Sequence, residues 1–176
     1  GVLVYFGNKE VVKWKRKKQQ QLLTLKMISQ QLSKWPEESI SPSQAKGTIK
    51  QLILGSPRNL SEYCLDYENN WHHDILYDLA TNKLTQKDGK IVFNTEGKLN
   101  RKILILAPRN HAKSTTLSVN YPIWKLYNNS DYRLIIVSNT ADQSTAFLRE
   151  IKHHLEKNNK LIKTLDTIVP LYPDKW

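Results

Sequence analysis

Cysteine and long apolar runs are scarce in this sequence. Cys64 is the single cysteine among 176 residues, so the chain has no internal disulfide, as is typical of proteins in a reducing compartment. Its neighbours in the sequence include Glu62 and Asp66 and no cation that would lower the pKa of the thiol. We therefore expect a buried structural thiol at Cys64. No apolar run approaches the roughly 20 residues that a helix needs to cross a bilayer.

Acidic residues are also few compared with basic ones. Lys and Arg number 27 against 16 Asp and Glu, which gives a formal net charge of +11. An excess of this size favours polyanionic partners such as nucleic acid or anionic lipid. The densest basic run, residues 13–18, contains Trp14, which is able to stack on a base. A solvated helix face is an equally good interpretation of this run.

Two regions are predicted from the patterns along the chain. Residues 1–57 are expected to be a basic helical extension and linker, with apolar residues at helical spacing between residues 22 and 32. Residues 58–176 are expected to be the first portion of a second, α/β domain. The chain starts at Gly1 and its only methionine is Met27, so we expect either a processed start or a part of a longer protein.

Short β-type runs in the second region predict a sheet. Residues 91–93 and residues 103–106 are separated by a turn at Gly97, and a further run occupies residues 134–137. Residues 103–106 are apolar at every position, which is typical of a strand buried in a largely parallel sheet. Residues 83–90 are polar and indicate a loop.

Helices are predicted between and around these runs. One is expected from Asn59, one from Trp71, one from near Lys113 and one after Thr140, which has capping-box spacing to Gln143. The order strand, loop, helix, strand, helix predicts an α/β fold with right-handed crossovers.

The predicted strand at residues 103–106 and the helix from Lys113 are joined by Ala-Pro-Arg-Asn-His-Ala-Lys-Ser, residues 107–114. A phosphate-binding loop needs a tight turn whose N–H groups converge on an anion, followed by a helix N-terminus. It also needs a lysine for the β- and γ-phosphates and a hydroxyl for Mg²⁺, which Lys113 and Ser114 would supply. The spacing matches G-x-x-x-x-G-K-[ST], with alanine in both glycine positions. A strand-to-helix turn that happens to end in Lys-Ser is the alternative.

Three residues of this loop have particular physical consequences. If Ala112 is left-handed, as glycine is at this position, its Cβ costs about 1 kcal/mol. The guanidinium of Arg109 suits a γ-phosphate and its transition-state charge, or else it pairs with a carboxylate elsewhere in the fold. His111 either hydrogen-bonds a phosphate or packs within the loop.

The segment of residues 103–116 resembles the Walker A segment of the large terminase subunits of tailed phages and prophages, whose typical form is A-P-R-G-H-G-K-S-T. Residues 121–126 (Tyr-Pro-Ile-Trp-Lys-Leu) and residues 134–140 (Leu-Ile-Ile-Val-Ser-Asn-Thr) are similar to two further segments of that family. The likeness covers roughly residues 71–161. It implies a RecA-like P-loop NTPase core and an ATP hydrolase that uses ATP and Mg²⁺ to drive double-stranded DNA into a capsid.

Carried over by position, the resemblance also implies a set of site residues. Lys113 and Arg109 would be catalytic, and Ser114 would hold Mg²⁺. Trp71 and His72 lie where the family places residues near the adenine base, although a core tryptophan at a helix start is the alternative. The implied ATP contacts in the loop are Pro108, Arg109, Asn110, His111, Ala112, Lys113, Ser114 and Thr115. Ser138, Asn139 and Thr140 would relay the nucleotide state, touch DNA, or cap the next helix.

The sequence also departs from the family pattern. Asn110 and Ala112 stand where the family commonly has glycine. No acidic residue after Lys113 closes an apolar strand, so the Walker B acids and the family's nuclease domain are expected outside this chain, which by itself should hydrolyse ATP poorly. The implied partners are a portal protein, a small terminase subunit and further copies in a ring, in the host cytoplasm.

Two other readings of the sequence stay open. One is a different P-loop NTPase acting on nucleic acid, such as a helicase-like protein or a nucleotide kinase. The other is a basic nucleic-acid-binding module whose loop never turns over ATP.

Overall fold

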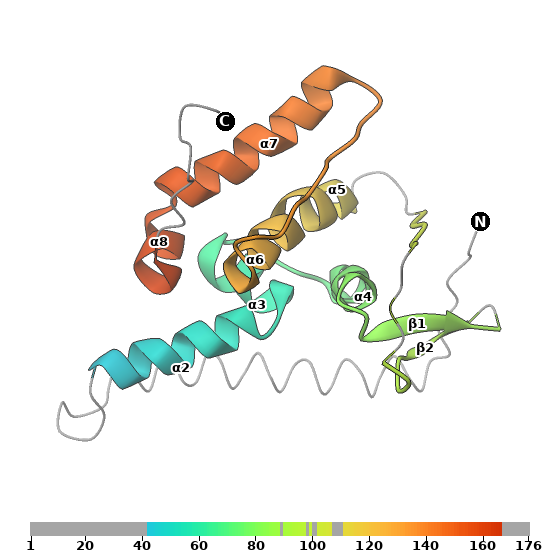
Figure 1. The fold of residues 1–176 in the computed structure, drawn as a ribbon, viewed down its shortest axis with the longest axis horizontal. Helices are drawn as coiled ribbons and strands as arrows, with labels where there is room; N and C mark the ends of the chain where they lie inside the picture. The colour runs from blue at the N-terminus through green and yellow to red at the C-terminus, as the bar shows by residue number, and fades with distance from the viewer. Residues whose placement is uncertain (1–41, 89, 98, 100–101, 107–110, 167–176) are drawn as a thin grey trace. The chain divides into compact units, whose positions relative to one another are not determined.

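A computed structural model describes residues 42–88, 90–97, 99, 102–106 and 111–166. These residues form a mixed α/β structure that is mostly helical, with a two-stranded antiparallel sheet (Figure 1). The chain divides into two compact units. We call Ile49–Asn69 with Ser114–Trp176 the helical unit, and Gly1–Thr48 with Asn70–Lys113 the hairpin unit. The helix predicted from the apolar spacing of residues 22–32 lies outside the described residues.

The helical unit is built from short helices around one apolar core. Its elements are α2 (Pro42–Leu54), which begins in the hairpin unit, α3 (Pro57–Cys64), η1 (Thr116–Asn120), α6 (Tyr121–Asn128), α7 (Ala141–Lys157) and α8 (Asn159–Leu165). Every one of these contributes to the core, whose buried residues are Ile53, Leu60, Cys64, Leu65, Val119, Ile123, Ile151, Leu155, Leu161 and Leu165. Burial of these side chains is the main source of the unit's stability.

Local sequence signals explain where the helices begin. Pro57 occupies the first turn of α3 after the extended residue Ser56, because its fixed φ suits a helix start. The helix therefore begins two residues before the predicted Asn59. The Thr140 hydroxyl accepts a hydrogen bond from the Gln143 N–H at 3.3 Å, which confirms the predicted start of α7.

Polar side chains tie the helices of this unit together. The Asn120 amide donates to the buried Ser61 hydroxyl at 2.9 Å, and the Trp124 indole donates to the Leu54 carbonyl at 2.8 Å. The Asn158 amide donates to the carbonyl of Cys64 at 2.9 Å. Cys64 is fully buried, and this burial raises the pKa of its thiol to about 12. The prediction of a structural thiol is confirmed, because a group with that pKa is not a thiolate at neutral pH.

The hairpin unit combines a helix with a β-hairpin. Helix α4 (Trp71–Ala80) is followed by β1 (Leu84–Lys87) and β2 (Lys90–Phe93), which pair antiparallel with Leu84 opposite Phe93. Residues 91–93 were correctly predicted as a strand. The prediction of a loop over residues 83–90 is wrong, because they contain β1. Its four residues include a single apolar one, Leu84, so the strand carries almost no hydrophobic signal of its own.

The predicted parallel sheet is not formed among the described residues. Residues 103–106 and residues 134–137 have no regular secondary structure and pair with no described strand. Several of their side chains are strongly exposed, with Ile135 and Val137 each at 86%. An apolar run shows that a segment can be buried, but a strand also needs a neighbour for its backbone N–H and C=O groups. No described helix is long and apolar enough to span a membrane.

Candidate phosphate-binding loop

The described part of the predicted phosphate loop begins at His111. Pro108, Arg109 and Asn110 lie outside the described residues, so their predicted ATP contacts have no structural account. Ala112 follows with a φ of +48°, and helix α5 (Lys113–Thr115) begins at the next residue. The predicted helix start near Lys113 is therefore confirmed.

The left-handed backbone of Ala112 is unusual in this chain. The other non-glycine residues with positive φ in the described part are all Asp or Asn, namely Asp66, Asn82, Asp88 and Asp166. Asp and Asn tolerate this conformation because their short polar side chains hydrogen-bond locally, whereas the alanine Cβ meets the following carbonyl at a cost of roughly 1–2 kcal/mol. Strain of this kind persists only where the surrounding structure imposes it, and it gathers at functional sites.

A left-handed residue before a helix has a direct consequence for anion binding. Ala112 is left-handed and Lys113 is already helical, so consecutive N–H groups turn toward the same side of the chain. Such a pair of residues forms a concavity of the kind that binds anions. This is the conformation for which glycine is normally used at the residue before the lysine.

The helix after the loop is continuous through three elements. α5 runs into the π-helical η1 and then into α6, and Thr116 and Asn120 of η1 are each only 2% exposed. Ser114 is exposed at its start, while Lys113 and Thr115 are half-buried. A π turn is rare and often lies next to a functional site, since it shifts the residues after it around the helix axis. Nothing in the sequence pattern indicated this element.

A histidine joins the loop to the start of α4. The Nδ1 atom of His73 accepts a hydrogen bond from the Asn70 N–H at 2.9 Å, and its Nε2 atom lies 3.2 Å from the carbonyl oxygen of His111. Because Nδ1 accepts, we assign the proton to Nε2, which then donates to His111. The Asn70 side chain also accepts hydrogen bonds from the first turn of α4, so Asn70 and His73 form a capping box. The same neutral His73 ring bonds the loop through the His111 carbonyl.

His72 and Trp71 lie beside the same end of the loop. The His72 ring is 3.9 Å from that of His73 and 5.3 Å from that of His111, centroid to centroid. The Trp71 indole meets His72 edge-on at 5.7 Å and is 42% exposed. Burial, together with the neighbouring His111, lowers the pKa of His72, so this ring is neutral at pH 7.

The structure thus brings together three of the predicted site residues, Trp71, His72 and His111. It adds His73, which the sequence reasoning missed. A signal for His73 was present in the sequence, because Asn70 and His73 have the spacing of a capping box with histidine in the place of the usual Glu or Gln.

Ser138 and Thr140, two of the three residues predicted to relay the nucleotide state, touch DNA or cap a helix, form hydrogen bonds at the start of α7. The Ser138 hydroxyl donates to the side-chain oxygen of Gln143, and Thr140 caps the helix. Asn139 is exposed. Of the three roles left open for these residues, capping of the next helix is the one that the geometry shows for Thr140.

The residue that the motif assigns to Mg²⁺ is Ser114. Within the described ranges, no group of three or more His, Cys, Asp or Glu side chains is arranged to hold a metal ion. A nucleotide-bound Mg²⁺ takes most of its ligands from phosphates and water, with one or two from the protein. The exposed hydroxyl of Ser114, next to Lys113, fits that requirement.

Comparisons of the chain with protein-family models, with curated proteins and with solved structures find no match.

Proposed function

We propose that this chain is the nucleotide-binding part of an ATP-driven motor of the terminase large-subunit kind, which packages double-stranded DNA. The observation that carries the proposal is the left-handed Ala112 immediately before a helix that begins with Lys113 and Ser114. A phosphate loop needs this backbone at this position, whereas an ordinary strand-to-helix turn does not require a left-handed alanine.

Each loop residue has a role that follows from its chemistry. The Lys113 ammonium would bind the β- and γ-phosphates, and the Ser114 hydroxyl would hold Mg²⁺. The Arg109 guanidinium would stabilise the charge that develops on the γ-phosphate during transfer. His73 would keep the loop in position through the His111 carbonyl, 3.2 Å from its Nε2 atom. ATP with Mg²⁺ would supply the phosphoryl group.

The base of the nucleotide has a candidate platform beside the loop. Trp71 is 42% exposed, and its edge rests on His72. An exposed indole face stacks on a flat aromatic ring, and the contact contributes about 1–3 kcal/mol in nucleic-acid complexes. The neutral His72 leaves the platform without a charge that would repel or attract the phosphates.

The proposal extends to the fold and to the assembly. In a RecA-like core, residues 103–106 and residues 134–137 would be strands of one parallel sheet, and their exposed apolar side chains would be covered. The working particle would be a ring of copies that meets a portal protein and a small terminase subunit in the host cytoplasm. The formal charge of +11 is favourable for the DNA that such a ring surrounds.

Binding of Mg-ATP to the whole chain, measured by calorimetric titration, tests the proposal. Lys113→Ala should weaken binding by about 10- to 100-fold, since it removes a charge-assisted contact of roughly 1.5–3 kcal/mol. Lys157→Ala is the matched control, because Lys157 is an exposed lysine of α7 in the other unit. Equal and weak binding by all three proteins would reject the nucleotide site and favour a basic module that contacts nucleic acid without ATP.

A further inference from the structure

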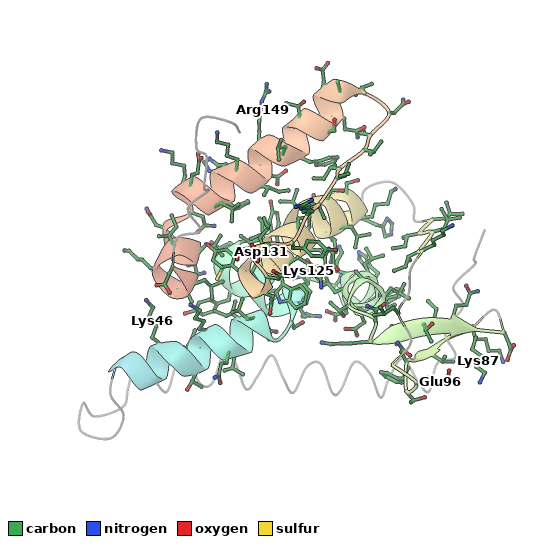
Figure 2. All side chains as sticks on the ribbon, viewed as in Figure 1. Lys46, Lys87, Glu96, Lys125, Asp131 and Arg149 are labelled. Carbon is green, nitrogen blue, oxygen red and sulfur yellow. The ribbon has the colours of Figure 1, made fainter. Side chains whose placement is uncertain are left out.

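The turn end of the β1–β2 hairpin presents two lysines to each other. Lys87 and Lys90 are direct cross-strand partners, both are exposed, and Figure 2 shows Lys87 at this end of the hairpin. Neither forms an ion pair with any residue in the described part of the chain. Like charges directly opposite each other destabilise an antiparallel pair. A fold keeps such a pair against its own stability where the charges serve a partner.

The wider segment is basic as well. Residues 83–102 contain six Lys or Arg residues against two acidic ones, Asp88 and Glu96. Residues 141–166, which span α7 and α8, contain five basic residues against four acidic ones. The positive charge of the hairpin is therefore a local feature and not the average of the chain.

We propose that this end of the hairpin is a nucleic-acid contact, in which Lys87 and Lys90 bind the phosphodiester backbone of a duplex. The register places both lysines on one face of the hairpin, together with Thr85 and Val92. A phosphate between or beside the two ammonium groups attracts both of them. Binding therefore relieves the electrostatic repulsion that destabilises the free hairpin. This contact supplies the DNA surface that the proposed motor needs, but it does not depend on the nucleotide site.

The chemistry of the hairpin favours nucleic acid over a membrane surface. A hairpin that inserts into a bilayer needs apolar or aromatic residues at its tip, whereas the turn here reads Lys-Asp-Gly-Lys. The exposed aromatic residue, Phe93, lies at the other end of β2 and on the opposite face from the lysines. The one apolar residue that shares the lysine face in β1 and β2 is Val92, and lysines without an aromatic anchor beside them suit a phosphate backbone.

Binding of a labelled DNA duplex of random sequence, measured by fluorescence anisotropy over a series of salt concentrations, tests this proposal. The variant Lys87→Gln/Lys90→Gln should lower the slope of log K against log salt by about two, since each phosphate contact contributes roughly 0.9. The variant Lys157→Gln/Lys163→Gln removes the same charge from exposed lysines of α7 and α8 and should change the slope by less than half a unit. Equal losses in the two variants would overturn the proposal, because only net charge would then matter.

A gain-of-binding variant completes the test. Asp88 sits between the two lysines with a φ of +50°, a conformation that asparagine adopts equally well. Asp88→Asn should therefore keep the turn, remove one repulsive charge and tighten duplex binding about two- to threefold at low salt. Asp142→Asn, at an exposed position in α7, is the control that should leave binding unchanged. No gain from Asp88→Asn beyond that control would contradict the proposal.

Two further arms identify the partner and separate the two proposals. Vesicles containing phosphatidylserine should bind the native chain and the Lys87→Gln/Lys90→Gln variant alike, and loss of vesicle binding without loss of duplex binding would assign the hairpin to membranes instead. Mg-ATP affinity should be the same in all hairpin variants. A failure of the hairpin proposal therefore leaves the nucleotide site standing, and a failure at Lys113 leaves the duplex measurements valid.

Discussion

The two units of this chain use their side chains differently. The helical unit buries an apolar core to which all of its longer helices contribute, and it also buries the hydrogen bond from the Asn120 amide to the Ser61 hydroxyl. The hairpin unit leaves Phe93, Leu104 and Leu106 more than 60% exposed and places like charges opposite each other at Lys87 and Lys90. The helical unit also exposes apolar residues, with Ile135 and Val137 each at 86%, so the pair of like charges is what distinguishes the hairpin unit.

Backbone conformation follows the same division. In the helical unit, the positive φ values fall on Asp66 and Asp166, which follow the ends of α3 and α8. In the hairpin unit, Ala112 adopts the same conformation without a side chain that favours it. Positive φ values therefore fall on aspartates at helix ends in the helical unit, and in the hairpin unit also on an alanine of the loop where we propose that the chain binds phosphate.

The largest difference should appear when a leucine is truncated in each unit. Leu60→Ala should cost about 2–5 kcal/mol of unfolding free energy, because Leu60 is fully buried and its loss leaves a cavity. Leu104→Ala should cost less than about 0.5 kcal/mol, since Leu104 is 66% exposed. Urea denaturation of both variants measures the two values. Similar losses would show that residues 103–106 are buried in solution.

Removal of a helix cap in each unit should change the free energy of unfolding by smaller amounts. Asn70→Ala should cost about 1–2 kcal/mol, because it breaks a reciprocal capping box at α4. Thr140→Ala should cost about 0.5–1 kcal/mol, because its single cap bond at α7 is 3.3 Å long. Denaturant midpoints would rank the two. A larger loss for Thr140→Ala would mean that His73 does not complete the box.

Substitutions at Ala112 test the left-handed loop by their sign. Ala112→Gly should be neutral or stabilise the chain by up to about 1 kcal/mol, because glycine carries no Cβ penalty at a φ of +48°. Ala112→Val should destabilise it by about 1 kcal/mol or more, since a β-branched residue is disfavoured there. Thermal unfolding of the pair measures both effects. Destabilisation by glycine would place Ala112 in an ordinary conformation.

Acidification should destabilise the helical unit through His154. Burial lowers the pKa of His154, although the adjacent Glu150 opposes this shift. A lowered folded-state pKa means that the unfolded chain takes up the proton first, so this contribution is complete above about pH 6.5 and is lost as the pH falls below it. His154→Gln should remove this loss between pH 7 and 5, whereas His153→Gln, at the exposed neighbour, should retain it. Equal pH profiles for the two variants would contradict this account.

The sequence predicted the elements whose signals are local. Thr140 with Gln143 marked the start of α7, and the loop motif marked the helix from Lys113, because caps and motifs act over a few residues. The sequence did not predict β1, whose four residues are mostly polar and become a strand only through pairing with β2. It also predicted strands at residues 103–106 and 134–137, where the apolar pattern is clear but no described partner is present. Pairing is a non-local property, and hydropathy alone does not encode it.

In the candidate site, too, the sequence predicts the local features and not the contacts between distant residues. The need for a left-handed residue before Lys113 followed from the motif, but only the structure shows that alanine adopts it. Contacts of the loop with α4 join residues 73 and 111, which are far apart in the sequence. No spacing rule predicts a contact over that distance, so the sequence signals only the capping role of His73 and not its contact with the loop.

The most direct test of the nucleotide site is amide hydrogen exchange, read residue by residue by NMR with and without Mg-ATP. If the backbone before α5 binds phosphate, N–H groups of residues 109–114 should exchange at least about tenfold more slowly with the nucleotide, since they are then donors to phosphate oxygens. The amides of α8 should be unchanged. Unaltered exchange throughout residues 109–114 at saturating Mg-ATP would contradict the account.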